Sequence, residues 1–416
     1  MLQDCNSFYV SAERAFDPSL KGEAVIVASN NDGCTVARSD EAKAIGIKMG
    51  DPIHLIKDKI RKHSVRVLSS NYTLYGDMQR RVLAAAEPFA HEVEIYSIDE
   101  SFIVPPPGTV DLDGHARALR EQVLRWTTIP TCVGIGPTKV IAKLANATAK
   151  KNPMFAGVAN LMDERARGWV YERFDVADVW GVGGATAAKL AALGIRTAAQ
   201  LSDMPLKQAR ALGTVVLERL VTELRGERAS ALELAPPPRK GMAVTRSFGA
   251  PVTDFDTMMG ALAQYVMRAG EKLREHGLVA GRLTVLFHTN RHRTDKPFYG
   301  ASRTLDLHPM TSDSLELLAT ARRGAERAWR DGYAYTKAGV MLEDLVAAEL
   351  RPRTLFEADP ERRERLMAAL DEINRRHGRF TAVPGTQGFK RPWRMRAAMK
   401  SPAYTTRLAD VPVVRA

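Results

Sequence analysis

Two adjacent carboxylates, Asp99 and Glu100, lie inside the stretch EVEIYSIDESFIV at 92–104, whose apolar flanks are typical of buried strands. Charges at a strand junction cost free energy unless a partner neutralises them. A third carboxylate, Asp4, lies near the start of the chain, where DCNSFY predicts a short strand that turns into a helix. If this strand lies beside the one that ends at Ile98, the three carboxylates form one cluster.

Three carboxylates within a few ångströms repel one another by several kcal/mol, so divalent cations are their natural compensation. Ligation by oxygen alone favours Mg²⁺. Two Mg²⁺ ions bridged by carboxylates lower the pKa of an attacking hydroxyl and neutralise a leaving pyrophosphate, as in phosphoryl transfer. The alternative interpretation of an isolated Asp-Glu pair is a solvated turn.

The carboxylates belong to a region in which strand and helix patterns alternate. Residues 74–89 place Leu74, Met78, Val82 and Ala86 at a spacing of four, which predicts a helix with one buried stripe. The other expected elements are strands at 24–29, 93–98, 101–104 and 131–136 and a helix at 118–126. The first 160 residues therefore predict a mixed α/β domain with helices packed on a sheet.

Four further regions follow this domain. A glycine-punctuated helical pattern at 179–195 predicts a small helical domain, and three consecutive prolines within 226–241 predict an extended tether. Mixed patterning resumes at 242–346, and between Arg268 and Arg303 eight Lys and Arg residues stand against three Asp and Glu. Residues from 351 onward are typical of a tail with one helix at 361–376.

Composition restricts the class of protein. A length of 416 residues predicts about three or four domains. The net charge of +12 favours a polyanionic partner, with nucleic acid ahead of a membrane surface, although a merely basic surface is the alternative. The chain lacks both an apolar run of about 20 residues and a secretory signal, so we expect a cytoplasmic protein. Cys5, Cys34 and Cys132 form no CxxC pair and are expected to be buried reduced thiols.

Five ordered motifs resemble those of the Y-family translesion DNA polymerases. They are DCNSFYVSAERAF (4–16), SNNDGCTVARSDEAKAIGIKMGDP (29–52), YSIDESF (96–102), TCVGIGPTKVIAKLANATAKKNP (131–153) and VWGVGGATAAKLAALGI (179–195). The segment PWRMRAAMKSPAYTTRLAD at 392–410 is similar to the tail of the UmuC-type catalytic subunits of bacterial DNA polymerase V. The resemblance thus covers nearly the whole chain.

The resemblance implies an α+β multidomain fold, a right-hand polymerase with palm, small fingers, a helix-hairpin-helix thumb and a tethered little finger. The expected ranges are palm 1–24 and 70–165, fingers 25–69, thumb 166–232, linker 233–241, little finger 242–346 and a C-terminal tail 347–416 that holds a candidate clamp-binding peptide and a partner-binding region. Only three residues precede Asp4, where relatives usually carry a fuller strand, so the first strand is expected to be short or the start of the sequence to be internal.

The resemblance also assigns roles to single residues. It places the catalytic metal ligands at Asp4, Asp99 and Glu100, with the main-chain carbonyl of Cys5, and implies two Mg²⁺ ions that assist attack of a primer 3′-hydroxyl on a dNTP. Tyr9 matches the steric gate, whose ring lies where a ribose 2′-hydroxyl would be.

The remaining nucleotide-binding residues follow from the same resemblance. Phe8 packs against the sugar in the family, and Lys43, Lys150 and Arg38 match positions that contact the triphosphate. Asp40 stands where many relatives have a phosphate-binding tyrosine. A carboxylate there is unfavourable beside a triphosphate, so we expect Asp40 not to contact it and the nucleotide to be held less firmly.

DNA contacts are implied in two regions. GVGGATAAKL at 181–190 resembles a helix-hairpin-helix, in which Gly181 and Gly183 let a phosphate approach backbone N–H groups and Lys189 adds charge; a simple helical connection is the alternative. In the little finger, phosphate contacts give a binding that weakens with salt. The candidates there are Arg282, Arg291, Arg293 and Lys296.

The resemblance implies further partners. Leu355 and Phe356 in RTLFEAD match a sliding-clamp-binding peptide that lacks its usual glutamine, and a linker with two incidental apolar residues is the alternative. A UmuC-type protein would work on primed and damaged DNA in the SOS response, with a processed UmuD-type dimer and a RecA filament, in the bacterial cytoplasm at the nucleoid.

We therefore predict a DNA-directed DNA polymerase that performs error-prone translesion synthesis. Two alternatives stay open. One is a non-catalytic DNA-binding subunit that keeps the polymerase fold at lesions, and the other is a different two-metal enzyme such as a nuclease or cyclase.

Overall fold

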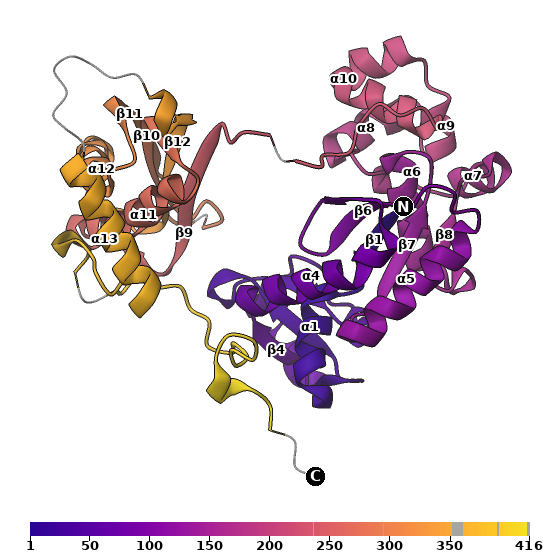
Figure 1. The fold of residues 1–416 in the computed structure, drawn as a ribbon, viewed down its shortest axis with the longest axis horizontal. Coiled ribbons are helices and arrows are strands. Elements are labelled where there is room, and N and C mark those ends of the chain that lie inside the picture. Colours follow the sequence, from indigo (N-terminus) through magenta and orange to yellow (C-terminus); the bar gives the residue numbers. More distant parts are fainter. Residues whose placement is uncertain (236, 294, 352–360, 389–390, 414–416) are drawn as a thin grey trace. The chain divides into compact units, whose positions relative to one another are not determined.

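The short strand at the start of the chain forms the middle of a five-stranded sheet in the computed structural model (Figure 1). Strand β1 (Leu2–Cys5) pairs antiparallel with β6 (Glu100–Val104) on one side and with β7 (Thr131–Ile135) on the other. β5 (Glu92–Ile95) pairs outside β6, and β8 (Val158–Asn160) pairs outside β7. All four residues of β1 are buried, which is expected of a central strand. The three strands predicted in this region are confirmed, and the first strand is indeed short.

Four helices pack on this sheet and on one another. They are α1 (Phe8–Phe16), α4 (Tyr72–Ala86), α5 (Leu112–Thr127) and α6 (Lys139–Lys151). The predicted apolar stripe of α4 is buried, so that prediction is confirmed. Helix α6 lies directly on β7 because Gly134 has no side chain: a Cβ at this position would lie 2.1 Å from the main-chain oxygen of Ala142.

A smaller sheet lies between β1 and α4 in the sequence, inside the range expected for the fingers. Its strand order is β3-β2-β4, with β2 antiparallel to β3 and parallel to β4. Every residue of β2 is buried, because this strand is central. The elements of this region are β2 (Val25–Ala28), β3 (Thr35–Arg38), α2 (Asp40–Ala44), α3 (Lys57–Lys62) and β4 (Arg66–Ser69).

The region after β8 is helical, as predicted. Leu190, Leu201 and Leu220 are part of the apolar core that these helices share with one face of α6. The helices are α7 (Glu164–Tyr171), α8 (Gly184–Ala192), α9 (Ala198–Ser202) and α10 (Leu206–Leu224). Gly213 and Thr214 leave the helical conformation, so α10 consists of two helical segments.

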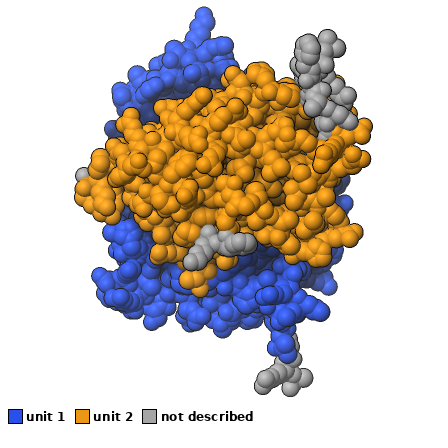
Figure 2. Space-filling model, turned by 90° about the vertical axis from the view of Figure 1, so that its left-hand side faces the viewer, with its two compact units in different colours: residues 1–29, 33–236, 399–416 blue, residues 30–32, 237–398 orange. Residues whose placement is uncertain are grey.

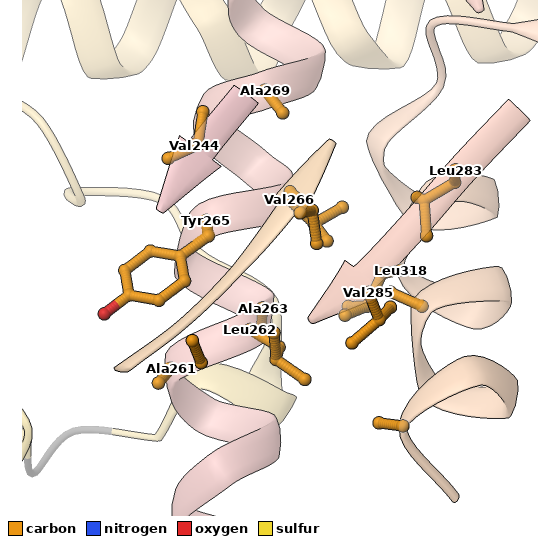
Figure 3. Packing of buried hydrophobic residues seen from close by; sticks show 14 of the residues in the cluster. Val244, Ala261, Leu262, Ala263, Tyr265, Val266, Ala269, Leu283, Val285 and Leu318 are labelled. Atoms are coloured by element: carbon orange, nitrogen blue, oxygen red, sulfur yellow. The ribbon is translucent and has the colours of Figure 1, made fainter. Parts of the chain in front are cut away.

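The basic region 242–346 folds as a four-stranded antiparallel sheet with two helices on one face. Figure 3 shows Leu262 and Val266 of one helix and Leu318 of the other near Leu283 and Val285 of the sheet, all within one buried cluster. The elements are β9 (Gly241–Val252), α11 (Phe255–Glu275), β10 (Leu278–Thr289), β11 (Gly300–Thr311), α12 (Ser314–Ala328) and β12 (Tyr335–Ala347), and the strand order is β11-β10-β12-β9.

The C-terminal region contains packed elements as well as the predicted helix. Helix α13 (Glu361–His377) is held to α11 by a bidentate ion pair of Arg274 with Asp371, with N–O distances of 2.7 Å. Trp393 is buried, and a Cβ at Gly260 would lie 2.7 Å from its ring. The region is therefore attached to the body of the protein at several points.

The chain divides into two compact units (Figure 2). Unit 1 comprises residues 1–29, 33–236 and 399–416, and unit 2 comprises residues 30–32 and 237–398. The structure describes residues 1–235, 237–293, 295–351, 361–388 and 391–413. Within those ranges, no helix has both the length and the apolar character needed to cross a membrane.

Candidate active site

The strand register brings the three predicted carboxylates together. Asp4 lies directly opposite Glu100 in the β1–β6 pair, and the backbone N–H of Cys5 donates to the carbonyl oxygen of Asp99 at 2.9 Å. The predicted neighbour of the first strand was wrong: β1 pairs with β6, which begins at Glu100, and not with the strand expected to end at Ile98, but this register still places Asp4 opposite Glu100. A cavity of about 440 Å³ opens here, and its walls include Asp4, Cys5, Phe8, Tyr9, Arg38, Lys43, Asp99, Glu100 and Lys150. These are all the residues that the sequence predicted to bind metal or nucleotide.

Lysines from α6 compensate two of the three carboxylates. The Nζ atom of Lys150 lies 2.5 Å from Asp4, and Lys143 donates to both oxygens of Glu100 at 3.0 and 3.1 Å. Asp99 instead accepts from the hydroxyl of Ser97 at 2.6 Å. In the described part of the chain, no three His, Cys, Asp or Glu side chains are placed so that they could hold a metal ion, and Asp4 and Glu100 each face a lysine.

Burial dominates the protonation of Asp4. Loss of solvent raises the pKa of Asp4 to about 7, and the negative charges of Glu100 and Asp99 act in the same direction. The nearby ammonium group of Lys150 lowers the pKa, but its effect is smaller than that of burial. Burial also raises the pKa of the Cys5 thiol well above its usual range, so this thiol stays protonated.

Two aromatic rings, those of Phe8 and Tyr9, line the cavity, and further rings support Tyr9 from behind. The ring of Tyr9 stacks on that of Tyr75, with centroids 4.2 Å apart and planes 11° apart, and it meets Tyr72 edge-on at 6.1 Å. Phe8 is buried, whereas Tyr9 is half-buried and lines the cavity. The rigid stack leaves the Tyr9 ring little freedom to move away from a ligand.

Two cations extend from the small sheet and the helix after it. Lys43 donates to Asp40 at 2.7 Å and to the hydroxyl of Ser7 at 3.1 Å, so Asp40 neutralises the nearest cation. The Nη1 atom of Arg38 donates to the carbonyl oxygen of Ile47 at 2.9 Å, while its buried Nε has no hydrogen-bond partner among the described residues. Both side chains line the cavity, Lys43 with its charge balanced by Asp40.

Comparison with known proteins shows to which family the chain with this cavity belongs. The impB/mucB/samB family matches residues 3–147, and its C-terminal domain matches residues 239–355. The protein ImpB of Salmonella typhimurium is 41% identical over 423 residues, covering 100% of this chain and 99% of that protein. The protein UmuC of Salmonella typhimurium strain LT2 is 40% identical, covering 99% and 98%. The chain belongs to the impB/mucB/samB family. It is a UmuC-type Y-family polymerase, as the five motifs predicted.

More distant relatives agree with this membership. DNA polymerase IV of Moorella thermoacetica is 28% identical over 91% of this chain and 93% of that protein. The solved Y-family DNA polymerase chimera Dbh-Dpo4(243-245)-Dbh has a TM-score of 0.65 at 18% identity, over 83% of this chain and 98% of the chimera. The predicted Y-family fold is therefore confirmed. Residues 364–414 match a domain of unknown function, DUF4113.

Y-family polymerases as a class depend on divalent metal ions, and the donor set of this UmuC-type member fits such ions. Asp4, Asp99 and Glu100 supply only oxygen, the ligand type that Mg²⁺ prefers. Their mutual proximity needs positive charge, which Lys143 and Lys150 supply in the structure. A metal ion at the same carboxylates would take over this compensation.

The raised pKa of Asp4 predicts a pH-dependent effect of Asp4→Asn in metal-free protein. Because burial lifts the folded-state pKa from 3.8 to about 7, the wild type loses stability as pH rises through this interval. The variant does not titrate there. The free energy of unfolding of Asp4→Asn minus that of the wild type should therefore be about 1–3 kcal/mol larger at pH 8 than at pH 4.

Urea unfolding in EDTA at both pH values measures this difference, with Asp58→Asn as a control because the Asp58 side chain is fully exposed. Adding Mg²⁺ at pH 8 should stabilise the wild type more than Asp4→Asn. A difference between wild type and Asp4→Asn that does not change with pH would contradict the assignment.

Two residues of the site were missed from the sequence. Lys143 pairs with Glu100 and lies 4.1 Å from the ring centroid of Tyr96. Its helical spacing from Lys139 and Lys150 could have indicated a basic face on α6. Tyr75 was overlooked because it adjoins the apolar stripe of α4, although its spacing of three from Tyr72 places both rings on one side of the helix.

The glycines predicted in the thumb have distinct conformations. Gly181 has a φ of +95°, which disfavours any other residue, and Gly183 is the N-cap of α8. A Cβ at Gly183 would meet nothing within 4 Å, so the backbone there is accessible. Lys189 is weakly held, donating to the carbonyl oxygen of Leu212 at 3.4 Å.

The predicted DNA-binding cations of unit 2 differ in their charge balance. Arg282 forms a bidentate pair with Asp344 at 2.6 and 2.9 Å, and Arg293 pairs with Asp295. In contrast, Arg291 lies over the ring of Phe298, and Lys296 is exposed. Counting charges along the sequence therefore overstated the free positive charge. The predicted clamp-binding residues Leu355 and Phe356 lie outside the described residues.

Proposed function

We propose that this UmuC-type polymerase performs error-prone translesion DNA synthesis at the cavity between β1, β6 and the rings of Phe8 and Tyr9. The single observation that supports this assignment most is the register of Asp4 opposite Glu100, in a cavity that also contains Tyr9, Lys43 and Lys150. Family membership makes the chain a DNA-directed DNA polymerase, a nucleotidyltransferase. Neither the comparisons nor the described residues favour the non-catalytic alternative.

The proposed roles follow from the chemistry of the cavity. Asp4, Asp99 and Glu100, with the Cys5 carbonyl, would hold two Mg²⁺ ions, which when bound supply Lewis-acid activation of the primer hydroxyl and neutralise the leaving pyrophosphate. Lys150 must then leave Asp4, which frees its ammonium group for the triphosphate.

The cations and rings of the cavity then bind the nucleotide. Lys43, Lys150 and Arg38 bind the phosphates through charge-assisted hydrogen bonds. Tyr9 excludes a 2′-hydroxyl by overlap, and Phe8 packs beside the sugar. The ion pair with Asp40 reduces the positive charge that Lys43 can offer to a triphosphate, so we expect weak nucleotide binding.

DNA is proposed to bind at the thumb and at unit 2. Gly181 and Gly183 present backbone N–H groups to a phosphate near the start of α8, with Lys189 adding charge. Contacts in unit 2 are made to phosphates and carry no sequence information.

The charge balance of unit 2 predicts different effects for its cations. Lys296→Ala should weaken DNA binding and lower the slope of log affinity against log salt by about 1. Arg293→Ala should change the slope less, because Asp295 already compensates Arg293. Fluorescence anisotropy with primed DNA at several salt concentrations measures both slopes, and equal slopes for the two variants would contradict the prediction.

The partners rest on the family alone. We propose primed and damaged DNA and dNTPs as substrates, a processed UmuD-type dimer and a RecA filament as activators in the SOS response, and a sliding clamp at Leu355 and Phe356. The proposed location is the bacterial cytoplasm at the nucleoid.

Extension of a radiolabelled primer across an abasic site tests the function. The purified protein with Mg²⁺, dNTPs and the proposed activators should lengthen the primer past the lesion. Binding of primed DNA without extension would favour the non-catalytic alternative. Primer shortening would identify a nuclease.

A further inference from the structure

A buried hydrogen bond connects the ring that supports Tyr9 to helix α1. The hydroxyl of Tyr75 donates to Oε1 of Glu13 at 2.7 Å, and the two residues are 0% and 1% exposed. A carboxyl group at such a position is costly unless its oxygens are satisfied. Because the Tyr9 ring stacks on Tyr75, any shift of Tyr75 moves the surface against which Tyr9 rests.

The far end of the chain completes the environment of this carboxyl group. Burial raises the pKa of Glu13, whereas the hydroxyls of Tyr75 and Ser401 and the charge of Lys400 lower it to a smaller extent. Ser401 and Lys400 belong to residues 399–404, which we call the C-terminal strap. A segment almost 390 residues away in sequence is therefore close enough to influence the carboxyl group that accepts from Tyr75.

The strap also holds the first turn of α4. The side-chain amide of Asn71, the N-cap residue of α4, donates to the hydroxyl of Ser401 at 2.9 Å and to the carbonyl oxygen of Pro402 at 3.2 Å. Just before it, the backbone N–H of Ser69 donates to the carbonyl oxygen of Met399 at 2.9 Å. Tyr75 lies in this first turn, so the strap contacts its helix where the ring is attached.

A third contact joins the strap to α1. The ring of Tyr404 stacks on that of Phe16, with centroids 5.0 Å apart and planes 7° apart. Phe16 lies two turns after Tyr9 on the same helix. The strap thus packs against both helices that carry the Tyr9–Tyr75 stack.

We propose that the C-terminal strap, acting through Asn71, Glu13 and Tyr75, positions Tyr9 and so sets the discrimination against ribonucleotides. The strap lies inside residues 364–414, which match a domain of unknown function. Residues 399–404 of that domain would thus support the active site. The inference rests on the proposed function of Tyr9 as the steric gate. Tyr75, Glu13 and the strap residues are positioning residues, since none of them has to touch the nucleotide.

Tyr75→Phe in the full chain tests the internal part of this connection. The variant keeps the stacked ring and removes the hydroxyl that anchors it. We expect the ratio of kcat/KM for dNTP to that for the matching rNTP to fall about three- to ten-fold, the size of one net hydrogen bond. This ratio does not depend on the fraction of folded enzyme, so loss of stability alone leaves it unchanged.

The matched control is Tyr171→Phe, which removes another buried tyrosine hydroxyl, one that donates to the carbonyl oxygen of Leu224 at 3.0 Å. It should lower stability similarly and leave the ratio unchanged. A ratio that responds equally to both variants would overturn the proposal.

Tyr404→Ala and Ser401→Ala test the strap itself. Each should lower the ratio about two- to five-fold, by loosening the contact on Phe16 of α1 or on Asn71 at the start of α4. Leu408→Ala, four residues beyond the strap, is the control, because Leu408 is 91% exposed. In a Tyr9→Ala background the strap variants should have no further effect, since the positioned ring is gone.

The outcomes separate the two levels of inference. If Tyr9→Ala lowers the ratio but Tyr75→Phe and both strap variants leave it at the wild-type value, the strap proposal is wrong and the gate stands. If Tyr9→Ala itself leaves the ratio unchanged, the proposed role of Tyr9 is wrong, and with it the positioning role.

Discussion

Replacing Asp99 with alanine is expected to reduce primer extension at least about 10³-fold, which corresponds to about 4 kcal/mol of lost transition-state stabilisation. Asp99 contributes one of the three carboxylates that line the cavity, and, unlike Asp4 and Glu100, it pairs with no lysine among the residues that the structure describes. Its removal takes away a proposed metal ligand without exposing a buried cation. Single-turnover extension of a primed template with saturating dNTP and Mg²⁺ measures the effect.

Asp58→Ala is the matched control, because it removes the same charge from a fully exposed position in the same unit. It should extend primers at the wild-type rate. Asp99→Ala should still bind primed DNA and unfold cooperatively, since the strand pairing around it uses backbone atoms. Full synthesis by Asp99→Ala would remove the basis of the proposed mechanism.

Tyr9→Ala is expected to admit ribonucleotides, with a fall of about 100-fold in the preference for dNTP over rNTP. The ring is held against Tyr75 and bounds the cavity on the side where Phe8 lies, so a 2′-hydroxyl would overlap it. Alanine removes that overlap. Extension assays with each nucleotide type alone, read as kcat/KM, give the preference.

Tyr9→Phe serves as the comparison for this variant. Because exclusion depends on the ring, phenylalanine should keep most of the preference for dNTP. If phenylalanine and alanine admit ribonucleotides equally, the phenolic hydroxyl rather than the volume of the ring makes the discrimination, and the steric account is wrong.

The lysines beside the carboxylates explain how the site is stable before metal or nucleotide binds. One buried carboxylate, Asp4, beside the partly buried Asp99 and Glu100 would destabilise the fold without compensation. Lys143 and Lys150 supply the missing charge from one face of α6. The proposed transfer of Lys150 from Asp4 to a triphosphate requires a flexible side chain, and the long stem of Lys150, whose side chain is 36% exposed, provides it.

The sequence by itself indicated the three carboxylates to which we assign metal binding, and the elements that hold them. Apolar patterning identified the strands around Asp4 and Asp99. Side chains alternate between the two faces of a sheet, so only a few strand registers keep the apolar residues buried and place an acidic residue where it is stabilised. Local rules were sufficient because each element depends on neighbours a few positions away. The order of five motifs then indicated the family.

Only the tertiary structure decided which groups surround these residues. The pairing of Lys143 with Glu100, the stack of Tyr75 on Tyr9 and the contact of Ser401 with Asn71 join residues between 43 and 330 positions apart. Helical periodicity gives the face on which a side chain lies but not the element that covers that face. The residues after 351 were predicted to be a tail because their apolar side chains are sparse. Their packing depends on distant segments, as in the contacts of Asp371 with Arg274 and of Tyr404 with Phe16.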